Sequence, residues 1–436
     1  MHINYSTVKQ QKEAKAKKNI KKAVWLYFWL LIFEGALRKW FLAPLAAPLL
    51  IVRDPVAIWI LITAINNKYL NRNIFVFAAI VTTAISFMAT MMVGHQNLFV
   101  AVFGARIFLL HFPLIFVIAT VFNHDDVVKM GKAIVWLTPP MTVLIALQFY
   151  SPQTAWVNRG VGGDESGAGF SGALGYFRPP ATFSFISGTT LFFSLAGAFI
   201  LYFWFNAALI KKWLLILATV AWLASIPICI SRTLFFQAVA TTLFLFPAII
   251  RNPKYISRAF IVMGSIAGIF VILALSPILQ TATEAFSARY NSANESGGGV
   301  QVVLLDRILG GIISAFQYSY NQPFLGYGLG MGTSAGSQLL TGKAQFLISE
   351  QEWARMIGES GLLLGIVFIL VRVGIIFSAL RSSLQQLAKG GDILPWLLLS
   401  VGFLQISQGE WGGPTILGFS VIIGGLMFAC FKKISG

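Results

Sequence analysis

Three arginines have the side chain and the sequence setting expected of a phosphate-binding site. A guanidinium group keeps its charge and presents a planar fork of N–H donors that matches phosphate or carboxylate oxygens. Arg178 stands in GYFRPPATFS, where two prolines stiffen the chain, and Arg232 stands in ISRTLFF between two very apolar segments. Arg307 follows Asp306 in a run with helical character. The structural alternatives are a snorkelling Arg232 at a helix end and a solvated Asp306–Arg307 pair.

A cluster of glutamates is a candidate source of a general base. Glu350, Glu352 and Glu359 lie in a short helical run that leads into an apolar segment. A carboxylate whose pKa is raised by partly apolar surroundings can take a proton from a reacting hydroxyl. The structural alternative is that acidic residues in a first helical turn interact favourably with the helix dipole. Glu410, in GEWGGP, is a further candidate for the same cavity.

The sequence gives little support for metal or dinucleotide chemistry. It contains no HExxH, CxxC or DxD cluster on the face opposite the termini, and its four histidines are scattered, at His2, His95, His111 and His124. The glycine-rich stretch PFLGYGLGMG at 323–332 lacks a surrounding βαβ unit, so it is not a dinucleotide fingerprint. We expect it to form a tight turn or to allow close approach of a ligand. The predicted reaction is therefore independent of metal and cofactor.

The composition shows that a membrane positions these residues. Of the 436 residues, 57% are hydrophobic and 11% are charged, which is far more apolar than a water-soluble domain. Apolar runs such as 74–92 and 256–275 match the ~20 residues that cross a bilayer as a helix. Backbone groups in lipid need internal partners, and the alternation typical of barrel strands is absent. The predicted fold is all-α.

We predict a polytopic protein of about twelve transmembrane helices. The expected spans are 22–38, 47–65, 73–93, 100–121, 129–150, 183–205, 211–229, 233–250, 257–278, 361–380, 393–408 and 414–431. They divide the chain into a basic cytoplasmic tail at 1–21, helices one to nine at 22–278 with a periplasmic loop at 151–182, a periplasmic loop subdomain at 279–360, helices ten to twelve at 361–431, and a cytoplasmic C-terminus at 432–436. Loops as long as 151–182 and 279–360 are usually functional or disordered.

The distribution of charge predicts the orientation. Twenty of the 32 Lys and Arg residues fall in the segments and adjoining helix ends that a cytoplasmic N-terminus places inside, including seven lysines between positions 9 and 22. Both termini are thus predicted to be cytoplasmic, and the net charge of +17 reflects this bias rather than binding to nucleic acid. The basic residues that oppose the bias are Arg38, Lys39, Arg53, Arg106, Arg159, Arg178, Arg232, Arg289, Arg307, Lys343, Arg355 and Arg372. An outward surface rich in arginine suits an anionic phosphate ligand.

The motifs, taken in order, resemble one family. RPPATFS at 178–184, SRT at 231–233, Arg307 in a loop helix, PFLGYGLG at 323–330 and EQEWARMIGESGLLLG at 350–365 are similar to the bacterial O-antigen ligase and polymerase family. The similarity covers roughly residues 170–375, and the flanks agree only in hydropathy.

The resemblance implies a GT-C-like glycosyltransferase of the bacterial inner membrane. Such proteins take an oligosaccharide linked to a polyprenyl diphosphate, such as undecaprenyl diphosphate, at the periplasmic face, form a glycosidic bond and release the lipid diphosphate. Arg178, Arg232 and Arg307 would grip the donor diphosphate and stabilise the charge that develops as it leaves. Arg289, Arg355, Glu359 and Glu410 are further candidates for the same site.

The resemblance also indicates which residues could act as the general base. Ligases of the family carry His-Asn nine residues before the Glu of a Glu-x-Gly motif, whereas here that position reads Glu350-Gln351 before Glu359. This departure favours a polymerase of surface or exopolysaccharide repeat units, with Glu350 or Glu352 as the base and a possible chain-length co-polymerase as partner. The alternatives are an O-antigen ligase and, in another class, a lipid-linked sugar flippase or secondary transporter. Transporters usually show matched halves, and the loop at 279–360 has no counterpart in the first half.

Overall fold

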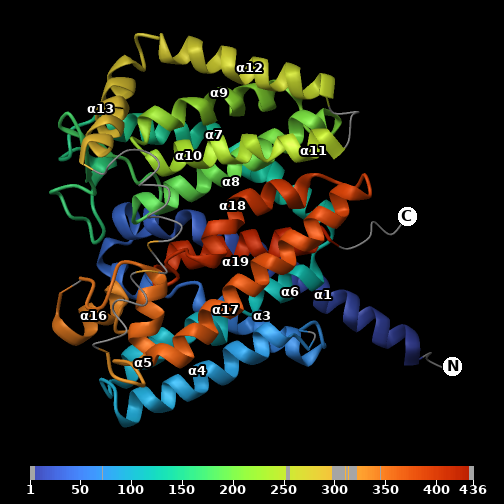
Figure 1. Cartoon of the computed structure of the whole chain (residues 1–436), viewed down its shortest axis with the longest axis vertical. Helices are drawn as coiled ribbons and strands as arrows, with labels where there is room; N and C mark the ends of the chain where they lie inside the picture. Colours follow the sequence, from blue (N-terminus) through green and yellow to red (C-terminus); the bar gives the residue numbers. More distant parts are fainter. Residues whose placement is uncertain are drawn as a thin grey trace.

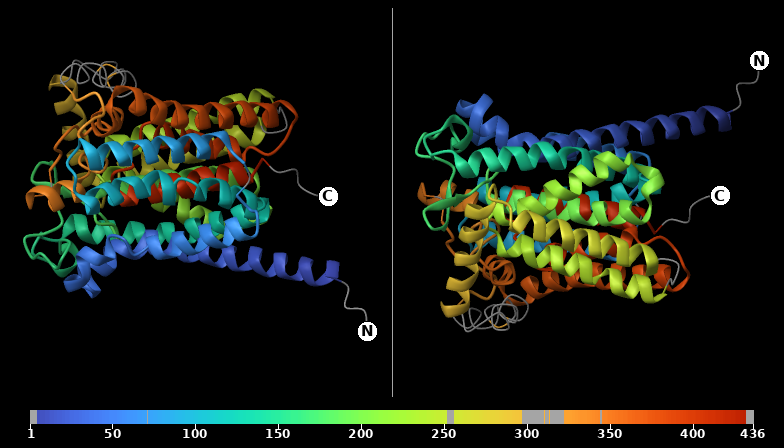
Figure 2. Two further views of the ribbon diagram at one scale, coloured as in Figure 1. Left: turned by 90° about the horizontal axis from the view of Figure 1, so that it is seen from below. Right: turned by 90° about the horizontal axis from the view of Figure 1, so that it is seen from above.

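The computed structural model describes residues 5–70, 72–251, 256–296, 310, 313, 322–343 and 345–431. Long helices run roughly side by side in one bundle (Figures 1 and 2). The first half comprises α1 (Tyr5–Ala36), a π-helical turn (Leu37–Phe41), a 3-10 turn (Ala43–Leu45), α2 (Ala46–Leu49), α3 (Asp54–Asn66), α4 (Ile74–Met92), α5 (Leu98–Arg106), a second π-helical turn (Ile107–His111), α6 (Leu114–Val121) and α7 (His124–Tyr150).

The second half begins with a short hairpin and returns to helices. A 3-10 turn (Trp156–Asn158) precedes strands β1 (Phe170–Ala173) and β2 (Tyr176–Arg178), which pair antiparallel with Phe170 opposite Arg178. The helices that follow are α8 (Ile186–Phe205), a 3-10 turn (Ala207–Leu209), α9 (Lys212–Ile228), α10 (Arg232–Leu243), α11 (Leu245–Arg251), α12 (Ile256–Ala274), α13 (Gln280–Ser296), α16 (Ser334–Thr341), α17 (Glu352–Ala388), α18 (Leu394–Ser407) and α19 (Pro414–Ala429). The hairpin is the one departure from the predicted all-α fold among the described residues.

Eight helical segments of the described chain are long and apolar enough to cross a bilayer. They are Ala43–Asn66, Ile74–Met92, Leu98–Val121, His124–Tyr150, Ile186–Phe205, Arg232–Arg251, Ile256–Leu273 and Glu352–Ala388. Three shorter apolar helices are α9, α18 and α19. The structure thus confirms a helical protein with several apolar helices of membrane-spanning length. Four of the twelve predicted spans fall on these shorter helices or on the apolar half of α1, so the count of twelve stays a prediction.

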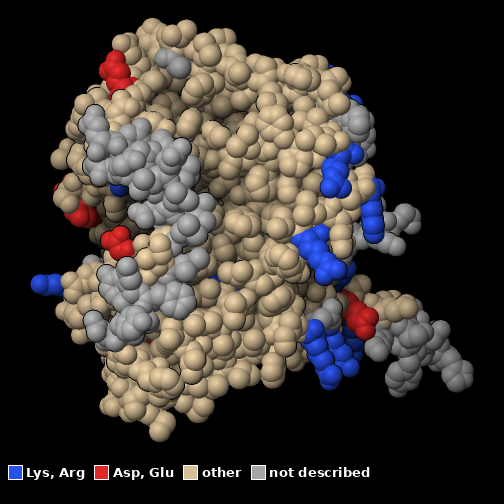
Figure 3. Space-filling view, viewed as in Figure 1, with Lys and Arg blue, Asp and Glu red and all other residues tan. Residues whose placement is uncertain are grey.

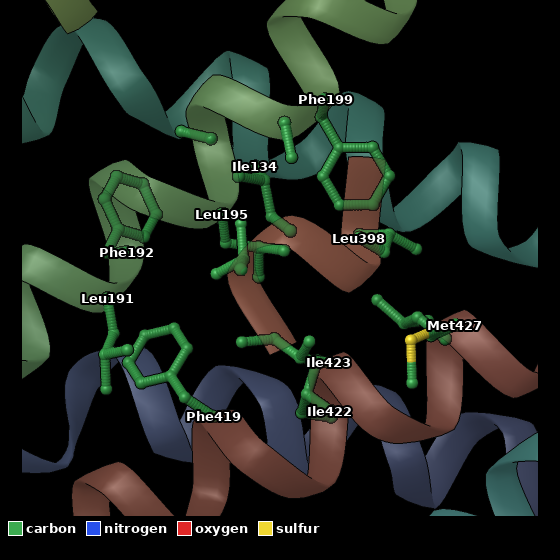
Figure 4. Close-up of a cluster of buried hydrophobic side chains, with 14 of the residues drawn as sticks. Ile134, Leu191, Phe192, Leu195, Phe199, Leu398, Phe419, Ile422, Ile423 and Met427 are labelled. Atoms are coloured by element: carbon green, nitrogen blue, oxygen red, sulfur yellow. The ribbon is translucent and has the colours of Figure 1, made fainter. Parts of the chain in front are cut away.

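The core lies where α8 meets α7, α18 and α19. Figure 4 shows Leu195 and Phe199 of α8 pointing toward Leu398 of α18 and toward residues of α19, among them Phe419 and Ile423. All five side chains are fully buried. Burial of this apolar surface against protein rather than lipid makes α8 the central helix of the bundle.

The two ends of the bundle differ in structure. We call the end that carries both termini the inner end, and the opposite end, formed by 37–53, 93–97, 151–185, 275–296, 322–343 and 407–413, the outer end (Figures 1 and 2). In Figure 3 the Lys and Arg side chains gather at the inner end, on the right, and the broad face between the ends is almost free of charge. This matches the separation of charge on which the predicted orientation rests.

Glycines shape the outer end. Gly361 lies inside α17 with a φ of 78°, which breaks the helix between Ser360 and Leu362. A Cβ at Gly361 would lie 2.0 Å from the carbonyl oxygen of Phe324, so only glycine fits there. The break lets the first turns of α17, with Glu352 and Glu359, fold over the outer end instead of continuing along the bundle.

Candidate anion-binding site

Six of the outward basic residues are neutralised by carboxylates. Glu34 and Arg38, spaced i,i+4, form one such pair, with Arg38 Nη1 3.3 Å from Glu34 Oε1. Further pairs, given as nitrogen to oxygen, are Arg53–Glu34 at 3.5 Å, Arg106–Asp54 at 2.7 Å and Arg159–Glu165 at 2.9 Å. Such pairing is the usual way to hold a guanidinium within or beside a membrane.

Two further outward arginines, Arg355 and Arg372, form a buried network with the carboxylates of Glu352 and Glu359 at the start of α17. Arg355 donates from Nε and Nη2 to the two carboxylate oxygens of Glu352 at 2.8 and 2.9 Å, and its Nη1 lies 2.6 Å from Glu359 Oε2. Arg372 Nη1 donates to Glu352 Oε1 at 2.5 Å, and its guanidinium lies 3.9 Å from the centre of the Trp411 ring. Two arginines and two carboxylates thus balance one another away from water.

This network occupies the side chains of three predicted site residues, Glu352, Glu359 and Arg355. Both oxygens of Glu352 already accept hydrogen bonds, and the side chain is 3% exposed, so an incoming hydroxyl has no free oxygen to reach. Glu359 Oε1 accepts from the backbone N–H of Gly332 at 3.0 Å while Oε2 holds Arg355. The geometry therefore suits Glu352, Glu359 and Arg355 to hold the outer end together rather than to meet substrate.

The glycine-rich stretch supports the same network. Tyr327 and Gly328 donate their backbone N–H groups to the carbonyl oxygens of Gly358 and Glu359, at 2.8 and 3.0 Å. Gly330 has a φ of 85°, and a Cβ there would lie 2.2 Å from the carbonyl oxygen of Val100 in α5. The predicted tight turn is present, but the close neighbour is the protein's own backbone and not an open ligand site.

Three of the outward arginines have no carboxylate partner among the described residues, and they lie together. Arg178 ends β2, Arg232 begins α10 and Arg289 lies in α13. Burial, and then the nearby charges of Arg289 and Arg232, lower the pKa of Arg178 to about 10. Burial and the charge of Arg232 also lower the pKa of Arg289. Three guanidinium groups that repel one another this way form a site that favours an anion.

The hairpin fixes two members of this arginine trio, Arg178, Arg232 and Arg289. Arg178 Nε donates to the carbonyl oxygen of Ser171 at 3.0 Å. Arg289 Nη1 donates to the carbonyl oxygen of Gly172 at 2.9 Å and makes a longer contact of 3.3 Å with that of Ser171. Both side chains thus donate hydrogen bonds to carbonyl oxygens of β1, and each keeps further N–H donors for a ligand.

Helix α10 fixes the third member. Ser231 caps the helix by accepting the N–H of Leu234 at 3.2 Å, and its hydroxyl lies 3.2 Å from that of Thr190 in α8. Arg232 is the first residue of α10, so the positive end of the helix dipole adds to its charge. The N-cap and the neighbouring α8 thus place Arg232 at the outer end.

Aromatic packing sets the distance between α10 and α13. The ring of Phe235 lies 5.7 Å from that of Phe286, and the ring of Phe236 lies 6.3 Å from that of Tyr290. Tyr290 directly follows Arg289 in the sequence, and Phe235 lies one helical turn after Arg232. These contacts pin the two helices together, so Arg232 and Arg289 cannot separate without losing buried aromatic surface.

A carboxylate with a suitable pKa lies at the same end. Burial of Glu410, and then the charges of Glu352 and Glu350, raise its pKa to about 7, against the opposing effect of Arg355. Glu410 stands in the loop after α18, and α18 packs against α10, where Gln237 Nε2 donates to the carbonyl oxygen of Ser400 at 3.0 Å. Arg232 and Glu410 therefore lie at the outer ends of two adjacent helices.

The outcome for the predicted site is mixed. The structure brings together Arg178, Arg232 and Arg289, the last of which was a further candidate, while Arg307 lies outside the described residues. Glu350 is exposed and close enough to Glu410 to raise its pKa. Arg289 is the only basic residue of α13, but nothing in its spacing indicates that it folds back onto β1. Within the described residues, no group of three or more His, Cys, Asp or Glu could hold a metal ion.

The arrangement can bind an oxyanion on three guanidiniums, and a carboxylate at the same end of the bundle can accept a proton. No family model matches the chain, and no curated protein is significantly similar to it.

Proposed function

We propose that this chain is a glycosyltransferase of the bacterial inner membrane that polymerises oligosaccharide repeat units linked to a polyprenyl diphosphate. The observation that carries the proposal is the arginine trio, which is left without a carboxylate among the described residues while the paired arginines around it are neutralised. A diphosphate bears the charge and the oxygen geometry that such guanidiniums bind best.

The proposed topology places this site in the periplasm. Twelve helices cross the membrane, and the lysine-rich inner end with both termini faces the cytoplasm. The outer end then faces the compartment in which lipid-linked repeat units await polymerisation. The motif resemblance to the O-antigen ligase and polymerase family supports the same placement, since it gathers around Arg178, Arg232 and the start of α17.

In the proposed reaction, a hydroxyl oxygen of the acceptor sugar attacks the anomeric carbon of the donor glycan. The new C–O bond forms as the bond between the anomeric carbon and the phosphate oxygen breaks, and the lipid diphosphate leaves on the arginine trio. The hydroxyl proton passes to a carboxylate. Glu410 is our proposed base because its pKa of about 7 lies near the operating pH, and Glu350, at the position of the family's His-Asn pair, is the second candidate.

The polymerase is preferred to a ligase because Glu350-Gln351 stands where ligases carry His-Asn. The test is to incubate the purified protein in liposomes with a synthetic polyprenyl-diphosphate repeat unit and a chelator, and to resolve the products by gel. A ladder of longer glycans supports the polymerase. Transfer of a finished glycan only onto a different lipid acceptor would favour the ligase, and movement of the unit across the bilayer without bond formation would favour the flippase.

A further inference from the structure

A separate cavity opens at the inner end of the bundle, whereas the arginine trio lies at the outer end (Figure 1). It has a volume of about 850 Å³ and is walled by the first residue of α7, the C-terminal end of α8 with its following turn, the first turns of α12 and the α17–α18 loop. This volume is in the range of cavities that bind small molecules. All its lining residues are described by the structure.

The acidic group of this cavity is already satisfied. Asp392 Oδ2 is in close contact with His124 Nε2 and accepts from the hydroxyl of Tyr202 at 3.3 Å. Asp392 Oδ1 accepts the backbone N–H of Leu394 at 3.2 Å. Because both carboxylate oxygens have donors, Asp392 offers little to an incoming cation.

The cationic group is only partly satisfied. Arg258 Nη1 donates to the carbonyl oxygen of Phe205 at 2.9 Å, which fixes the side chain across the cavity from α12 to α8. No described carboxylate forms an ion pair with Arg258, and a guanidinium has five N–H donors. The cavity therefore presents an anchored guanidinium with donors to spare, which suits a phosphate group.

One wall of the cavity is apolar and continues onto the outside of the bundle. Ile261 and Val262 line it, and the neighbouring Phe260 and Ile261 are exposed to 75% and 65% of their surface. Figure 1 shows α12 at the upper edge of the bundle, where it has neighbours on one side only. In a membrane this surface of α12 meets acyl chains.

We propose that the cavity binds an anionic phospholipid, with the headgroup phosphate on Arg258 and an acyl chain along α12. A soluble phosphate would use the guanidinium alone, whereas a lipid also covers the apolar wall, and this favours the lipid. The proposal does not depend on the reaction at the outer end.

The test uses the full-length protein in detergent and native mass spectrometry with dioleoylphosphatidylglycerol, dioleoylphosphatidylcholine or glycerol phosphate. We expect phosphatidylglycerol to be retained, and Arg258→Ala to weaken its binding about tenfold, as loss of a charge-assisted hydrogen bond would. Arg251→Ala is the matched control, because Arg251 is an exposed arginine at the same end of the bundle that does not line this cavity. It should leave binding unchanged.

Three outcomes would overturn the proposal. Equal retention of phosphatidylglycerol by wild type and Arg258→Ala would show that the cavity is not the site. Equal loss in Arg251→Ala and Arg258→Ala would indicate attraction to the charged inner end as a whole. Binding of glycerol phosphate as tight as that of the lipid would assign the cavity to a soluble phosphate. Circular dichroism of each variant checks that the helical fold is kept.

Discussion

Two groups of arginines at the outer end have opposite chemistry. In the network at the start of α17, Arg355 and Arg372 are matched by Glu352 and Glu359, and all four side chains are buried. In the arginine trio, no described carboxylate forms an ion pair with Arg178, Arg232 or Arg289, and burial together with the neighbouring positive charges lowers the pKa of Arg178 and of Arg289. The residue type is the same in both groups. The supply of counter-charges decides which arginines hold the fold and which remain ready for a ligand.

The largest effect should come from breaking the buried network. Arg372→Ala leaves Glu352 with one guanidinium instead of two and removes hydrogen bonds to the carbonyl oxygens of Ile406 and Gly409. Removing one member of a buried ion pair typically destabilises a protein by about 3–5 kcal/mol. We expect a large drop in thermal stability and poor recovery from the membrane, measured by fluorescence-detected gel filtration after heating. Recovery equal to wild type would mean that the network does not support the fold.

Changes in the arginine trio should instead spare the fold and remove activity. Arg232→Ala and Arg289→Ala each delete a donor expected to stabilise the leaving diphosphate, and loss of such a donor costs about 10²–10³ in turnover. The measurement is the rate of glycan elongation in liposomes, alongside thermal stability. Because each change also relieves repulsion between like charges, stability should stay the same or rise slightly. Full activity in both variants would contradict the diphosphate site.

The pH dependence of glycan elongation tests Glu410 as the base. As a base it must be deprotonated, so elongation by the wild type should fall as the pH drops below about 7. Glu410→Gln should lose about 10²–10⁴ in rate and the pH dependence with it. Glu350→Gln, made in parallel, should retain that pH dependence. The reverse pattern would assign the base to Glu350.

Glu410→Gln should lower activity but raise the stability of the protein. Folding raises the pKa of Glu410 from 4.5 to about 7, so the unfolded chain releases this proton first and stability falls as the pH rises through that interval. Glu410→Gln should therefore raise the melting temperature above pH 7 and leave it unchanged below pH 4.5, where both states are protonated. A variant equally stable with wild type at every pH would show that Glu410 is not desolvated.

The smallest effect is expected from an outward arginine that belongs to neither group. Arg159 pairs with Glu165 at 2.9 Å, but the carboxylate side chain is 77% exposed. Exposed pairs contribute about 0–1 kcal/mol, so Arg159→Ala should change neither elongation nor thermal stability measurably. A loss of activity as large as that of Arg232→Ala would mean that position at the outer end alone, rather than membership of the trio, determines function.

Part of this picture follows from local features of the sequence. The hydropathy of runs such as 74–92 predicted helices that the structure confirms, because in lipid only internal hydrogen bonding satisfies the backbone. The pair of Glu34 and Arg38 was predictable since i,i+4 residues share a helix face. The hairpin at Phe170–Arg178 was not predicted, since its strands are short and carry no clear alternation.

The sequence by itself determined that arginine would be abundant on one side of a helical membrane protein, because residue type and hydropathy are local properties of the chain. Only the tertiary structure decided which arginines meet a carboxylate. Arg372 finds Glu352 across twenty residues, and Arg289 reaches β1 across more than a hundred, so both outcomes depend on packing between distant segments. Pairing of charges is set by distances in space, and spacing along the chain does not encode them once helices turn back on one another.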